Sequence, residues 1–128
     1  MKIPVLFLLV LLNLIGIHQS WTRLGTTTVK FTAQQDAVYP VANYKFERIK
    51  FAVSGAPISL EDANVVFTDG SSELIHILAV VYKGSESREL VLKNDTTDIT
   101  RINFTYKAAK GFGDQNAKIS VWGKPKSF

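Results

Sequence analysis

The sequence predicts an all-β protein, a small antiparallel β-sandwich of about eight strands with a jelly-roll-like arrangement, preceded by a signal peptide. Three observations predict this. Helical periodicity is nearly absent after residue 20. Short alternating runs rich in Val, Ile, Phe, Tyr and Thr recur at intervals of about 8 to 14 residues, separated by Gly, Asp, Asn and Ser. The N-terminus is a short apolar segment that begins with a positive charge.

Residues 1–20 have the pattern of a cleavable leader. Lys2 supplies the positive charge, and a mainly apolar run extends from Ile3 to Ile17. A helix that spans a bilayer needs about 20 apolar residues, so this run fits a signal peptide better than an anchor. With cleavage before Trp21, residues 21–128 form a single domain that is secreted or periplasmic, with no stable membrane span.

The chain contains no cysteine, so neither disulfides nor a lipid anchor on cysteine is available. Small eukaryotic extracellular modules usually contain disulfides, so this composition is more usual in bacterial exported domains, stabilised by packing alone. The formal net charge is +4, and removal of Lys2 with the leader leaves +3. Such a charge is too small to indicate a nucleic-acid partner.

The N-terminal half contains four or five expected strands. Glycine and proline at residues 55–57 interrupt the chain, and Glu61–Asn64 is expected to be a turn because its residues are polar and small. The expected strands are Gly25–Phe31, Ala37–Tyr39, Tyr44–Val53, a short Ile58–Leu60 and Val65–Thr68.

The C-terminal half resembles a meander. A hairpin loop at Asp69–Ser72 leads into Leu74–Tyr82, whose apolar residues on both faces predict a central strand. A strand follows at Arg88–Leu92. The next strand alternates most cleanly, with Ile102, Phe104 and Tyr106 directed to the core and Arg101, Asn103, Thr105 and Lys107 to solvent. The last strand is Ala117–Trp122.

Several short motifs resemble a group of small exported bacterial β-sandwich proteins of unknown function. The resemblance spans most of residues 21–128, although some members carry cysteines that this chain lacks. It implies a periplasmic or secreted location and a role that is non-enzymatic or undetermined, and it supplies no catalytic residue. The motifs are Leu24-Gly25, Asp36, Arg48-Ile49-Lys50-Phe51-x-Val53, Gly55-Ala56, Val65-x-Phe67, Ile102-x-Phe104 and Trp122-Gly123.

Few residues suit catalysis or metal binding. His76 is the single histidine after residue 20, and its place within an apolar run predicts a packed, hydrogen-bonded side chain. One histidine without cysteine does not provide a zinc site, so neither a metal nor a cofactor is expected. The carboxylates lie mainly in expected loops, where Asp favours turns. A small secreted hydrolase that uses these loop carboxylates remains the alternative function.

Two features suggest binding. If their strands share one sheet, five basic side chains form a positive patch with Trp122 beside it, suited to lipopolysaccharide phosphates or acidic polysaccharide. These side chains are Arg48, Lys50, Arg101, Lys107 and Lys118. Phe112, between two glycines, either contacts a sugar or partner or caps the end of the sandwich. The alternative for the basic residues is an ordinary solvated strand face.

From these observations we expect a non-catalytic exported module that binds an envelope component, a glycan or a protein, and not an enzyme.

Overall fold

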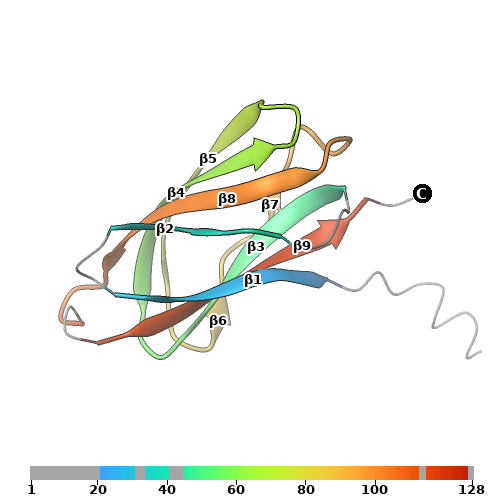
Figure 1. Cartoon of the computed structure of the whole chain (residues 1–128). Coiled ribbons are helices and arrows are strands. Elements are labelled where there is room, and N and C mark those ends of the chain that lie inside the picture. Colours follow the sequence, from blue (N-terminus) through green and yellow to red (C-terminus); the bar gives the residue numbers. More distant parts are fainter. Residues whose placement is uncertain (1–20, 31–33, 41–44, 113–114, 127–128) are drawn as a thin grey trace, which may run out of the picture.

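The computed structural model describes residues 21–30, 34–40, 45–112 and 115–126. The predicted signal peptide lies outside these residues, as do Phe31 and Tyr44 at the ends of two expected strands. Two antiparallel sheets pack face to face (Figure 1). In the described part of the chain, no helix is long and apolar enough to cross a membrane.

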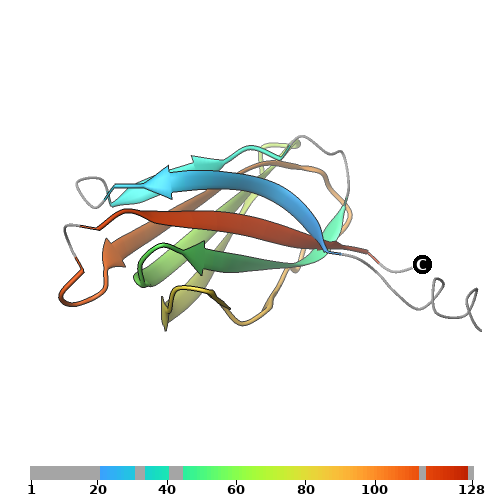
Figure 2. The same cartoon turned by 90° about the horizontal axis from the view of Figure 1, so that it is seen from below.

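The first sheet, sheet A, is formed mainly by three strands that lie side by side (Figure 2). Its order is β1 (Thr22–Val29), β9 (Ala117–Pro125), β3 (Phe46–Ser54) and β6 (Ser85–Glu86), and β7 (Leu90–Val91) also pairs with β3. The second sheet, sheet B, has the order β2 (Gln35–Val38), β8 (Ile99–Ala108), β4 (Ile58–Phe67) and β5 (Ser72–Val81).

The strand order confirms the predicted jelly-roll sandwich. The chain crosses from one sheet to the other between β1 and β2, β2 and β3, and β3 and β4. It then makes the β4–β5 hairpin within sheet B before returning to sheet A. β8 lies between β2 and β4, and β9 lies between β1 and β3. The centre of each sheet therefore pairs strands that are far apart in the sequence.

The core lies between the sheets and follows the alternation of the strands. In β3, Ile49 and Phe51 are fully buried, and in β8, Phe104 and Tyr106 are buried. The Phe51 and Phe104 rings meet edge to face across the sandwich, with centroids 5.5 Å apart. Each such buried side chain contributes about 1.5–3 kcal/mol, so core burial supplies the stability that disulfides would otherwise provide.

The expected turn at Glu61–Asn64 is wrong, because β4 runs unbroken through it. The register against β8 shifts between Leu60 and Ala63, so that Glu61 and Asp62 both lie opposite Thr105. This β-bulge accommodates one extra residue and leaves both Leu60 and Ala63 facing the core. Consecutive polar residues in a bulge resemble a turn when only the sequence is read.

The expectation of a central strand at Leu74–Tyr82 is also wrong. β5 is the edge strand of sheet B, and β4 is its single neighbour in the described part of the chain. Ile77 and Val81 face the core, whereas Leu78 is 75% exposed. The apolar residues on the outward face of β5 are therefore exposed to solvent at the edge of the sheet and are not buried.

Candidate binding face

The five basic residues are divided between the two sheets, so the condition for a single positive patch is not met. Arg48 and Lys50 of β3 and Lys118 and Trp122 of β9 belong to sheet A. β8 belongs to sheet B, so its two basic residues, Arg101 and Lys107, lie in the other layer of the sandwich. Alternation identifies the outward residues of a strand but not the sheet to which the strand belongs.

Neighbouring acids neutralise much of the positive charge on sheet A. The Arg48 guanidinium lies 3.0 Å from a Glu89 carboxylate oxygen, and the Lys50 ammonium lies 3.2 Å from Glu86. Lys50 is also 4.3 Å from the centroid of the Trp21 ring. Arg23 lies over Trp122 at 6.0 Å. These cations and rings are already engaged with one another, which weakens the case for a polyanion site here.

Phe112 is half-buried in the turn after β8. Its backbone N–H donates to the Ala109 carbonyl at 3.0 Å. It therefore shows neither the full burial of a capping residue nor the exposure of a ring held out for a ligand. Gly113 and Asp114 lie outside the described residues.

The outward side of sheet B carries a different set of groups, which we call the amide face: Gln35, Asn64, Asn103 and Thr105. Asn64 of β4 is the register partner of Asn103 on β8, and Gln35 of β2 is the partner of Thr105 on β8. Each residue alternates with core residues of its strand, so their side chains point away from the core. Three strands thus bring these groups to one surface.

A depression of about 590 Å³ lies over the amide face, lined also by Asp62 and Leu74. An adjoining depression of about 660 Å³ shares Gln35, Asp62 and Thr105 with it. Within the described residues, the side chains of Gln35, Asn64 and Asn103 form no hydrogen bond. Each amide offers a carbonyl acceptor and two N–H donors, so the depression presents hydrogen-bonding groups that the fold does not use.

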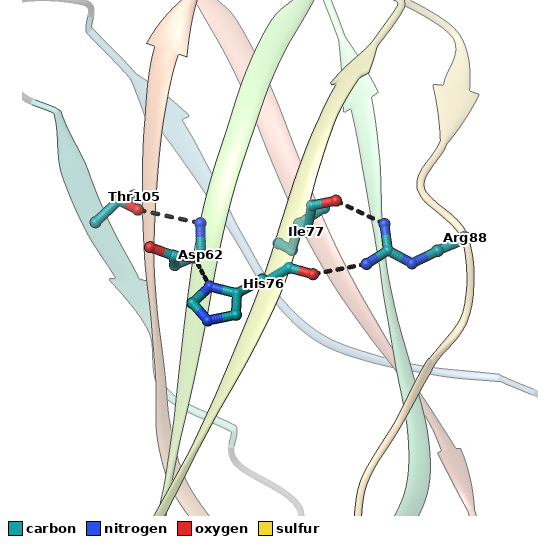
Figure 3. A network of polar contacts seen from close by, with 5 residues as sticks. All are labelled: Asp62, His76, Ile77, Arg88 and Thr105. Atoms are coloured by element: carbon teal, nitrogen blue, oxygen red, sulfur yellow. Dashed lines mark hydrogen bonds and ion pairs between the residues drawn. The ribbon is translucent and has the colours of Figure 1, made fainter.

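His76 lies at the β5 side of the amide face. The expectation of a packed side chain is wrong, whereas the expected hydrogen bond is present. The His76 side chain is 65% exposed, and its Nδ1 atom lies 2.6 Å from Oδ1 of Asp62 (Figure 3). The Asp62 backbone N–H donates to Thr105 Oγ1 at 3.2 Å. Among the described residues, no serine, threonine or tyrosine hydroxyl bonds the imidazole, and no group of three acidic or histidine side chains could hold a metal.

An apolar margin borders the amide face along β5 and the residue that follows it, and consists of Leu74, Leu78, Val80 and Tyr82. All four side chains are exposed. Sequence reasoning missed this margin, because the run was expected to be buried on both sides. It missed the Asn64–Asn103 pair for a related reason, since Asn64 was placed in a turn.

Comparison with known proteins gives a family and a fold. The sequence pattern of the family described as a domain of unknown function, DUF2541, matches residues 3–123. No curated protein sequence matches the chain. Among solved structures, AlgX of Pseudomonas aeruginosa is similar with a TM-score of 0.53 at 12% identity. The similarity covers 83% of this chain but 27% of AlgX, and at this identity it shows a shared fold alone.

Proposed function

We propose that this chain, which belongs to the DUF2541 family, is an exported, non-catalytic binding module whose amide face recognises a neutral glycan. The observation that carries the proposal is the depression lined by Asn64, Asn103 and Gln35, whose amides have no hydrogen-bond partner in the described part of the chain. Export rests on the leader pattern of residues 1–20.

The chemistry of the amide face suits sugar hydroxyl groups. A hydroxyl both donates and accepts, and a carboxamide does the same from two adjacent atoms. Asn64 and Asn103 occupy directly paired positions on central strands, so the sheet fixes their spacing before a ligand arrives. A preformed site of this kind loses little conformational entropy on binding. Its volume of about 590 Å³ lies within the usual range for small-ligand sites.

A protein partner fits this depression less well because of its size. The hollow has the volume of a small-ligand site, whereas a stable protein interface covers a broad surface. An acidic polysaccharide also fits less well, because the carboxylates of Asp36 and Asp62 line the depression itself.

A hydrolase fits less well again, because the nearby carboxylates are engaged. Glu61 pairs with Lys107 at 3.5 Å and Asp62 with His76 at 2.6 Å. Asp36 accepts hydrogen bonds from Thr27 and from the Ala37 backbone at 2.9 and 2.7 Å. A glycosidase needs two carboxyl groups that flank the scissile bond, so these contacts would have to be exchanged for contacts to the substrate.

A glycan array at low and high salt tests this proposal, with neutral and acidic glycans printed side by side. The test variant combines Asn64→Ala with Asn103→Ala. The control combines Thr26→Ala with Ser120→Ala, which removes a 2.9 Å hydroxyl pair from sheet A.

The wild-type protein and the control variant are expected to bind neutral glycans with little salt dependence. Each lost hydrogen bond is worth about 0.5–1.5 kcal/mol, so the double amide variant is expected to bind about 10- to 100-fold more weakly. Binding confined to acidic glycans, or binding that the amide variant retains in full, would refute the proposal.

A further inference from the structure

The free edge of β5 is closed by one side chain. Arg88, on the segment between β6 and β7, reaches back to β5 and donates from Nη1 to the Ile77 carbonyl and from Nη2 to the His76 carbonyl (Figure 3). Both donor–acceptor distances are 2.6 Å. In the described residues, Arg88 forms no ion pair, so backbone carbonyls are its partners.

A bulge in β5 prepares this contact. β4 pairs Leu60 with Ala79 and Asp62 with His76, so Ile77 and Leu78 together oppose one residue of β4. Leu78 has a φ of +50°, a backbone conformation that residues other than glycine rarely adopt. Successive carbonyls of a regular strand point to opposite edges, whereas here two successive carbonyls accept from one guanidinium.

The bulge at Ile77 and Leu78 and the Glu73 carboxylate, which accepts from the Lys93 and Asn94 backbone N–H groups, protect part of this edge. From Leu78 to Val81 the edge has no other protection in the described part of the chain. β6 and β7 follow β5 in the chain but pair with β3. Exposed edge strands are commonly short, charged or interrupted by proline, which prevents pairing with another chain. β5 has ten residues, no proline, and the exposed apolar margin along its outward side. Arg88 is therefore the side chain that covers the middle of an edge whose C-terminal part is suited to strand pairing.

We propose that β5 is the docking strand for a second copy of this chain, and that Arg88 keeps this edge closed in the monomer. Antiparallel pairing about a two-fold axis at Leu78 places Leu78 beside Leu78 of the other copy and His76 beside Val80. Leu74 then lies beside Tyr82. Each pair contains at least one apolar side chain, and none brings together two like charges. The margin of one copy can therefore pack against the same margin of the other copy.

Such a dimer joins two copies of sheet B into one sheet with both amide faces on the same side. A glycan with repeated units could then contact both depressions at once, which raises the apparent affinity. This consequence rests on the proposed function, whereas the pairing of β5 does not. Oligomeric state measured without glycan therefore tests the docking strand independently.

Sedimentation velocity over a range of protein concentrations tests the proposal with Arg88→Met, which keeps the aliphatic length and removes the donors. Dimerisation at least about tenfold tighter than in the wild-type protein is expected. Arg101→Met is the matched control, since Arg101 is an exposed arginine on sheet B with no such carbonyl contacts in the described chain. The control is expected to associate as the wild-type protein does.

Two further variants separate docking from misfolding. Arg88→Lys retains one donating group and is expected to give intermediate association. Val80→Lys, added to Arg88→Met, places a charge in the paired edge and is expected to restore the monomer. Far-ultraviolet circular dichroism checks that each variant is folded. A folded Arg88→Met protein that associates no more than the wild type, or a dimer that Val80→Lys leaves intact, would overturn the proposal.

Discussion

Replacement of Gly123 by alanine tests the packing of sheet A most sharply. Gly123 is buried in β9, between Thr22 of β1 and Ile49 of β3. A β-carbon at residue 123 would lie 2.5 Å from Cδ1 and 2.8 Å from Cε1 of Phe46. Carbon atoms in good contact are about 3.5–4.0 Å apart. The Phe46 side chain is 1% exposed, so the ring has no open solvent to move into.

The expected destabilisation follows from the overlap. Adding a methyl group to a packed core costs about 1–3 kcal/mol. A domain of this size has a free energy of unfolding of about 5–15 kcal/mol, so Gly123→Ala is expected to remain folded but weakened. At about 4–8 °C per kcal/mol, the melting temperature is expected to fall by roughly 5–20 °C.

Urea and thermal unfolding followed by circular dichroism measure this effect. Phe46→Leu shortens the side chain that the new methyl group meets, so the double variant is expected to be more stable than the sum of the two single changes implies. A Gly123→Ala protein within about 0.5 kcal/mol of the wild type would refute the packing described for β9 and β3.

Three further predictions concern ionisable groups. Burial, with a smaller contribution from the Asp36 charge, raises the pKa of Tyr106. The neutral phenol therefore stabilises the folded state below about pH 10, and this stabilisation is lost as pH rises through the raised pKa. Tyr106→Phe is expected to remove this alkaline loss in unfolding measurements, and an unchanged pH profile would contradict it. Hydrogen bonds from the Ser71 hydroxyl and backbone lower the pKa of Asp69, so Ser71→Ala is expected to raise that pKa in a carboxyl NMR titration. The protein is expected to release no reducing ends from bound glycans, and release that His76→Gln abolishes would restore the hydrolase interpretation.

The sequence identifies the inward and outward sides of a strand wherever alternation is regular. In β8, Phe104 and Tyr106 are buried and Asn103 and Thr105 face outward, as the period of two predicts. The same period cannot show that β8 lies in sheet B while β3 and β9 lie in sheet A, because that depends on long-range pairing. Whether the five basic residues share one surface therefore could not be predicted from the sequence.

The candidate site was harder to predict, because two irregularities determine it. The bulge at Glu61 and Asp62 keeps β4 continuous and places Asn64 beside Asn103, but its polar residues have the composition of a turn. The apolar outward residues of β5, such as Leu78, have the composition of a buried strand. Whether such residues face a neighbour or solvent depends on the place of the strand in the sheet, which local sequence does not encode.

Chemical-shift mapping of the purified protein by NMR tests the central proposal most directly, with the neutral oligosaccharide that gives the strongest array signal as the probe. The proposed function predicts that the largest shifts fall on Gln35, Asn64, Asn103 and Thr105 of sheet B. Shifts centred on Lys50 and Trp122 of sheet A, or no shifts at all, would contradict recognition of a glycan by the amide face.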